Sequence, residues 1–92
     1  METINDISEA HGVSVVVVGS ENCVACKQLK TKIEKAEIDA RYIDIEDVAD
    51  FLNRQPQKVR SLPVTIIFKN GKVDTMLTGN ISINKITQAC EG

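Results

Sequence analysis

Two of the three cysteines, Cys23 and Cys26, are separated by only two residues, in the stretch GSENCVACKQL. A close pair of thiols can form a reversible disulfide, supply half of a zinc site, or act as a structural cross-link. The third cysteine is Cys90, so the number of cysteines is odd. An odd number argues against a fully paired extracellular disulfide framework. In a reducing compartment, a close pair is more often catalytic or metal-binding than structural.

The surrounding residues predict that the pair lies where a buried strand meets a helix. Val13–Val18 is a valine-rich run, which is typical of a strand buried on both faces. Over Val24–Ala36, apolar residues recur every three or four positions and predict one buried helix face: Cys26, Leu29, Ile33 and Ala36. We therefore expect Cys26 to be buried and Cys23, at the helix entrance, to meet solvent.

This placement gives the two thiols different chemistry. A sulfur at a helix N-terminus faces the positive end of the helix dipole and backbone N–H groups that lack partners within the helix. These groups stabilise a thiolate, so we expect the pKa of Cys23 to lie below the ordinary value of about 8.5. Cys23 could then attack a disulfide, and Cys26, within disulfide reach, could resolve the mixed disulfide.

Zinc binding is the competing interpretation of the pair. A structural zinc site takes four ligands, usually from two such pairs. Only Cys90 and His11 remain as further ligands, and both are distant in the sequence. We interpret His11 as a surface residue at a helix end and Cys90 as a small core residue of the last helix. A regulatory or dimer-forming thiol is the alternative for Cys90. We expect no metal site.

The remaining elements alternate between helices and strands. A short helix is predicted over Thr3–Ala10, a strand over Arg41–Ile45, a short helix around Val48–Leu52, strands over Val64–Phe68 and Val73–Leu77, and a last helix capped by Ser82. The Asn-Gly pair between the last two strands is a strong hairpin signal. This order predicts an α/β fold, in which a four-stranded mixed sheet carries helices on both faces.

Length and charge exclude several classes of protein. The 92 residues suffice for a single domain spanning residues 1–92. A net charge of −2 argues against nucleic acid or an anionic membrane as the main partner. No apolar stretch is long enough to span a membrane, and the acidic, polar beginning METINDISEA is unlike a signal peptide. We expect a cytoplasmic monomer.

The strand, CVAC and helix in this order resemble the active site of thioredoxins and glutaredoxins. The stretch RSLPVTIIFKNGKVDTMLTGNIS resembles the thioredoxin segment from the cis-proline to the last helix. The resemblance covers nearly the whole chain from Val13 onward. It implies a thioredoxin fold and the activity of a thiol–disulfide oxidoreductase.

The resemblance also assigns roles to individual residues. Cys23 matches the nucleophile and Cys26 the resolving cysteine, which together form the redox-active disulfide. Pro63 matches the cis-proline that packs beside this disulfide. Leu62 matches the residue whose backbone pairs with bound substrate as an added strand. Gly79 matches the glycine that keeps the docking groove open.

Partners follow from the resemblance as well. It implies protein disulfides as substrates, with ribonucleotide reductase as one example, and no bound cofactor beyond the dithiol. Electrons would come from a thioredoxin-reductase-like flavoenzyme or from glutathione. Two alternatives stay open: a glutaredoxin-like, glutathione-dependent oxidoreductase, and a non-catalytic binding module with the same fold.

Several residues depart from the thioredoxin pattern. Asn22 precedes the first cysteine, Val24-Ala25 separates the pair, and Val17 stands where thioredoxins have a buried aspartate that handles protons. Proton transfer from Cys26 must then use water, another side chain or the substrate. The thioredoxin N-terminal strand is expected to be missing, and the segment ARYIDIED looks more like glutaredoxin. The stretch Thr78–Ser82 lacks the Gly-Gly pair with which glutaredoxins hold glutathione.

Overall fold

The structure is a computed structural model that describes residues 1–92. Its strands are β1 (Glu2–Ile4), β2 (Val15–Gly19), β3 (Ala40–Asp44), β4 (Val64–Lys69) and β5 (Lys72–Thr78). Its α-helices are α1 (Val24–Lys35), α2 (Ala49–Asn53) and α3 (Ile83–Glu91), and two short 3₁₀ helices are η1 (Ile7–Ala10) and η2 (Ile45–Asp47). No helix combines the length and the apolar character that crossing a lipid bilayer requires.

The strands form one mixed sheet in the order β1-β3-β2-β4-β5. Both β1 and β2 run parallel to β3, whereas β4 is antiparallel to β2 and β5 is antiparallel to β4. Every residue of β2 is buried, as the valine run predicted for a central strand. The α/β fold with a mixed sheet is confirmed, but the sheet has five strands instead of the predicted four.

The difference arises at the N-terminus, where the predicted helix over Thr3–Ala10 and the expected absence of an N-terminal strand are both wrong. Glu2–Ile4 forms the edge strand β1, and only the last turn, Ile7–Ala10, is helical. Asp6 caps this turn, and the Glu9 carboxylate accepts hydrogen bonds of 2.9 Å from the backbone N–H groups just before it. This capping box fixes a new helix start inside the segment, so its apolar residues share one cluster without sharing one helix.

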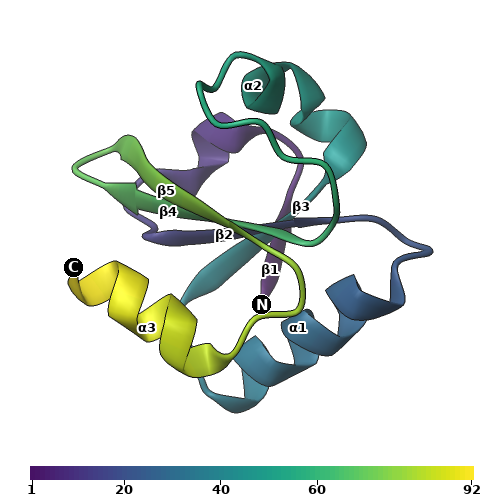
Figure 1. The fold of residues 1–92 in the computed structure, drawn as a ribbon, viewed down its shortest axis with the longest axis vertical. Helices are drawn as coiled ribbons and strands as arrows, with labels where there is room; N and C mark the ends of the chain where they lie inside the picture. Colours follow the sequence, from purple (N-terminus) through teal and green to yellow (C-terminus); the bar gives the residue numbers. More distant parts are fainter.

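The sheet separates α2 from α1 and α3 (Figure 1), and one apolar cluster lies on each of its faces. On one face, α2 covers a cluster whose buried members include Val16, Val18, Ile43, Leu52, Val64 and Ile66. On the other face, α1 and α3 lie side by side and cover a cluster of Val15, Val17, Leu29, Ile33, Ala40, Ile67 and Ile86. Successive residues of a strand point to opposite faces, which explains why neighbouring valines of β2 belong to different clusters.

The predicted turn and the Ser82 cap are present, and the other elements end within two residues of their expected bounds. Asn70 (φ 55°) and Gly71 (φ 76°) form the tight turn of the β4–β5 hairpin. The Ser82 side chain accepts a hydrogen bond from the backbone N–H of Lys85 and caps α3. The helix α1 ends one residue early, so Ala36 is an exposed C-cap and the buried stripe stops at Ile33.

Candidate redox site

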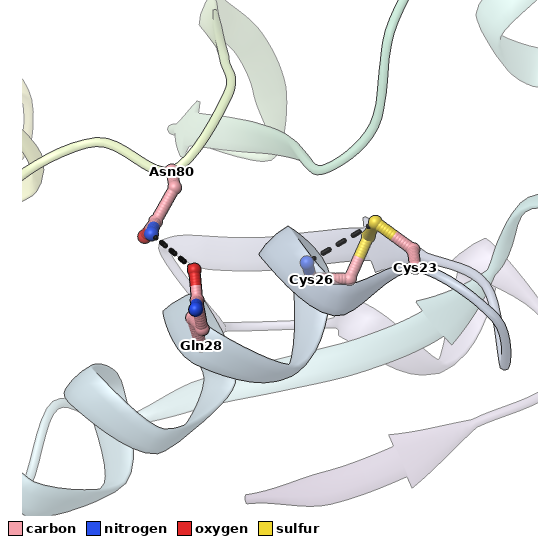
Figure 2. The surroundings of a disulfide bond; sticks show 4 residues. All are labelled: Cys23, Cys26, Gln28 and Asn80. Carbon is pink, nitrogen blue, oxygen red and sulfur yellow. Dashed lines mark hydrogen bonds between the residues drawn. A yellow bond between two sulfur atoms is a disulfide. The ribbon is translucent and has the colours of Figure 1, made fainter.

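Cys23 and Cys26 form a disulfide at the junction of β2 and α1, with their Cα atoms 5.2 Å apart (Figure 2). The short turn Ser20–Asn22 connects the buried strand to the helix. The sequence predicted this junction and this pairing, and the structure confirms both. The cysteine pair therefore lies between two regular elements, the end of β2 and the start of α1.

Cys23 is the N-cap of α1. Its sulfur accepts a hydrogen bond of 3.1 Å from the backbone N–H of Cys26, and its backbone is extended (φ −95°, ψ 107°) as in other N-caps. The residue is half-buried, so part of its surface meets solvent. The site therefore offers a partly exposed cysteine at the positive end of a helix dipole.

Cys26 lies one turn further on and is fully buried. It begins the apolar stripe that continues through Leu29 and Ile33, both of which are also fully buried. The predicted difference between an accessible and a shielded cysteine is confirmed. A shielded thiol suits intramolecular attack on its neighbour, since no external disulfide can reach it.

The strand below the disulfide comes very close to it at Gly19. A Cβ at this position would clash with the hydroxyl oxygen of Tyr42 and would lie 3.0 Å from Cβ of Cys26. The Tyr42 hydroxyl therefore fills the space that a glycine leaves beside Cys26. Lys30 covers the aromatic ring, with its Nζ 4.9 Å from the ring centroid. Burial raises the pKa of Tyr42, and the charge of Asp44 adds to the effect, so the phenol stays protonated near neutral pH.

The start of β4 lies at the same end of the sheet as the disulfide, because Val64 pairs with Val18 near the end of β2. Just before β4, the Leu62–Pro63 peptide bond is cis, as the resemblance implied, and Pro63 is buried. Leu62 is half-buried, and neither its N–H nor its carbonyl is hydrogen bonded within the chain.

Two hydrogen bonds connect the loop between β5 and α3 to the segment before β4 and to α1. The backbone N–H of Gly79 donates to the carbonyl oxygen of Pro63 at 2.8 Å, and the amide of Asn80 donates to Oε1 of Gln28 in α1 at 3.0 Å (Figure 2). Gly79 adopts φ +91°, and a Cβ there would meet nothing within 4 Å. The structure thus brings Pro63, Gly79 and the cysteine-bearing helix together. The resemblance pointed to Gly79. The hydrogen bond between Asn80 and Gln28 was not predicted, because no local sequence pattern marks two residues so far apart in the chain.

The other candidate ligands lie elsewhere. His11 is exposed at the end of η1, beside an open cavity of about 440 Å³ that Phe51 and Phe68 also line. Cys90 is a free, half-buried thiol of α3 that packs against the cluster under α1 and α3. Burial raises the pKa of Cys90, with a smaller opposing effect from Lys69. No group of three or more histidines, cysteines or acidic residues is placed to hold a metal ion.

The chain was compared with known families and structures. No family model matches it, and no curated protein matches it. Among solved structures, Plasmodium falciparum thioredoxin superposes with a TM-score of 0.73 and 18% identity, over 99% of this chain and 96% of that chain. Malassezia sympodialis thioredoxin superposes with a TM-score of 0.69 and 20% identity, over 98% of this chain and 89% of that chain. The glutaredoxin-like NrdH-redoxin of Escherichia coli superposes with a TM-score of 0.58 and 24% identity, over 73% of this chain and 83% of that chain. The chain is a thioredoxin-fold protein with a disulfide-forming Cys-Val-Ala-Cys pair.

Proposed function

We propose that this protein is a thiol–disulfide oxidoreductase that reduces protein disulfides. The observation that carries the proposal is the Cys23–Cys26 disulfide at the N-terminus of α1, with one accessible and one buried sulfur. The thioredoxin fold is consistent with it, although a fold alone does not define an activity. The site geometry provides the chemistry that the fold leaves open.

The reaction starts from the reduced pair. The thiolate of Cys23 attacks one sulfur of a substrate disulfide, forms a mixed disulfide, and releases the other substrate sulfur as a thiolate that takes up a proton. The backbone N–H of Cys26 and the helix dipole favour the anionic form of Cys23, which is the nucleophile.

Cys26 completes the reaction. Its thiolate attacks the sulfur of Cys23 in the mixed disulfide, and the second substrate sulfur leaves and is protonated. The products are a substrate dithiol and the Cys23–Cys26 disulfide seen in the structure. Two electrons pass from the protein to the substrate. An external donor must then reduce the disulfide for the next turnover.

Substrate docking is proposed for the surface formed by Leu62, Pro63 and Gly79. The unpaired backbone groups of Leu62 can form hydrogen bonds with an extended substrate segment, as an added strand would. Gly79 leaves open space beside this backbone. Val24, whose residue surface is 68% exposed, is the one large exposed apolar side chain and lies between the two cysteines. It offers an apolar contact close to the reacting sulfur.

Reduction of insulin disulfides with a small dithiol as electron donor tests the activity. The proposal predicts turnover by the wild type, complete loss in Cys23→Ser, and wild-type turnover in Cys90→Ser, whose thiol is remote from the pair. Equal turnover by wild type and Cys23→Ser would refute the proposal and favour a binding module that uses the fold without catalysis.

The reduction potential of the pair separates the two classes of electron donor. It is measured by equilibrating the protein in graded thiol buffers and following thiol labelling by mass. A midpoint near about −270 mV is typical of thioredoxins and favours a flavoenzyme donor, whereas about −200 mV is typical of glutaredoxins and favours glutathione. The glutaredoxin-like NrdH-redoxin, which is structurally similar to this chain, is described as having a thioredoxin-like activity profile.

A further inference from the structure

Three residues form a row across the sheet below α1. Val17 of β2 pairs with Tyr42 of β3 on one side and with Thr65 of β4 on the other. Paired residues point to the same face of a sheet, and Val17 belongs to the cluster under α1 and α3. The valine thus has a hydroxyl-bearing side chain on each side, on the face against which Cys26 is buried.

The hydroxyl of Thr65 lacks a hydrogen-bond partner. Thr65 is fully buried, and its Oγ1 is the one buried side-chain oxygen or nitrogen without a partner in the chain. Buried polar atoms in folded proteins are nearly always paired, so an unpaired hydroxyl requires an explanation. The structure contains the oxidised pair, in which the sulfur of Cys26 is bonded to Cys23 and carries no charge. The reduced protein differs in this respect.

The hydroxyl of Tyr42 lies beside Cys26 itself. Both the phenolic oxygen and Cβ of Cys26 lie next to the point where a Cβ of Gly19 would stand. The Nζ of Lys30 lies over the ring of Tyr42. Because its pKa is raised, the phenol keeps its proton and can donate a hydrogen bond over the physiological pH range.

The proposed reaction places a negative charge on Cys26 in both directions. Cys26 attacks as a thiolate, and it leaves as a thiolate when a donor thiol reduces the disulfide. A fully buried anion without hydrogen-bond donors is strongly disfavoured. Val17 cannot donate a hydrogen bond, whereas the hydroxyl groups of its two strand neighbours, Tyr42 and Thr65, can.

We propose that the hydroxyl groups of Tyr42 and Thr65 donate hydrogen bonds to the sulfur of Cys26 in the reduced protein, directly or through one water molecule, and stabilise its thiolate. The proposal rests on the proposed function, since it concerns the same pair. Four charged residues line an open pocket together with Tyr42: Glu21, Lys27, Lys30 and Asp44. The strand neighbours of Thr65 on this face of the sheet, Val17 and Leu77, are apolar and belong to or pack against the cluster under α1 and α3.

The test is the ionisation of Cys26 in the intact, reduced protein. The Cβ carbons of ¹³C-labelled cysteines report thiol ionisation by NMR, and single Cys→Ser variants assign the three signals. Wild type is compared with Tyr42→Phe and Thr65→Val, which remove one hydroxyl each and keep the side-chain shape. Thr75→Val, in the outer strand β5, is the matched control.

Each hydroxyl is expected to lower the pH at which half of the Cys26 thiol is ionised. Tyr42→Phe and Thr65→Val should therefore each reduce the acid ionisation constant of this thiol about tenfold. Thr75→Val should leave it unchanged. A midpoint equal to that of wild type in either variant would overturn the role of that hydroxyl. This readout is independent of insulin reduction. A wild type that is active while all midpoints coincide refutes only the hydrogen bonds, whereas an inactive wild type refutes the proposed function.

Discussion

The backbone N–H of Cys26 donates a hydrogen bond of 3.1 Å to the sulfur of Cys23, so the sulfur that we propose as the nucleophile is also the cap of α1. Serine, threonine, aspartate and asparagine commonly occupy N-cap positions, where a side-chain oxygen accepts this bond. Here a cysteine takes the same place. Reduction makes the sulfur a better acceptor when it ionises, so we infer that the cap persists in the state that performs the reaction.

The double role of Cys23 predicts different stabilities for two inactive variants. Compared with the reduced wild type, Cys23→Ser should retain the cap, because a serine hydroxyl accepts the same hydrogen bond. Cys23→Ala should lose about 1 kcal/mol of the free energy of unfolding, the usual effect of removing an N-cap side chain. Urea denaturation under reducing conditions measures both values. Ser82→Ala, which removes the cap of α3, is the matched control and should cost a similar amount. Equal stability of Cys23→Ser and Cys23→Ala would show that the sulfur does not cap the helix.

A second prediction concerns the order of the two attacks. With Cys26→Ser, the accessible Cys23 can still form the mixed disulfide, but the buried partner that releases the product is gone. We expect a long-lived covalent complex with an insulin chain, visible by mass spectrometry without reductant. Cys23→Ser should form no such complex, because Cys26 is fully shielded. Complexes of equal yield in both variants would contradict the assigned roles.

Much of this site follows from local patterns in the sequence. The valine run predicted the buried strand, the three-to-four residue spacing predicted which cysteine is buried, and Asn70-Gly71 predicted the hairpin. These features depend on residues near each other in the chain. The cis bond before Pro63 was expected only because of the resemblance, since an X–Pro bond is trans by default.

Other features depend on long-range pairing, which no local pattern encodes. The edge strand β1 exists because Glu2–Ile4 pairs with β3, some forty positions away in the sequence. The spacing of apolar residues over Thr3–Ala10 instead suggested a helix. The approach of Tyr42 to Gly19 requires the parallel register of β2 and β3. The unpaired hydroxyl of Thr65 becomes visible only when every neighbour is placed.

Thr65 carries a prediction for the stability of the oxidised protein. A buried hydroxyl without a partner keeps the penalty of losing water, so Thr65→Val should raise the free energy of unfolding by about 1 kcal/mol. Thr75→Val, at a half-buried position of β5, should change it by less than about 0.5 kcal/mol. Thermal or urea unfolding of the oxidised variants measures this difference. A loss of stability in Thr65→Val would mean that the hydroxyl is already paired in the oxidised state.

Cys90 predicts a pH dependence of stability. Burial raises the pKa of its thiol above the ordinary range of a cysteine, while the charge of Lys69 opposes this effect and that of Glu91 adds to it. Above about pH 9 the unfolded chain therefore loses this proton more readily than the folded chain, and stability falls as pH rises. Below that range both states keep the proton, so the contribution is constant.

Urea denaturation of the oxidised protein at a series of pH values tests this linkage. The difference in free energy of unfolding between wild type and Cys90→Ser should be constant from about pH 6 to 8. At about pH 9 and above, the free energy of unfolding of the wild type should fall relative to that of Cys90→Ser. The disulfide-bonded cysteines do not titrate, so they leave the comparison unaffected. A difference that is constant up to about pH 10 would show that Cys90 ionises equally in both states.

Gly79 and Gly12 form a matched pair for testing the docking surface. Both adopt positive φ angles, +91° and +76°, and at both a Cβ would meet no atom within 4 Å. Alanine at either position should cost about 1 kcal/mol through backbone strain alone. Only Gly79 is hydrogen bonded to Pro63, beside the backbone that we propose docks the substrate.

The two alanine variants should therefore separate stability from activity. Gly79→Ala should slow insulin reduction by raising KM several-fold, since its methyl group would occupy open space at the surface that we propose docks the substrate. Gly12→Ala, at the end of η1, should leave the kinetics unchanged despite a similar loss of stability. If both variants kept the wild-type KM, the surface beside Gly79 would not contact the substrate. If both raised it equally, the effect would come from backbone strain and not from docking.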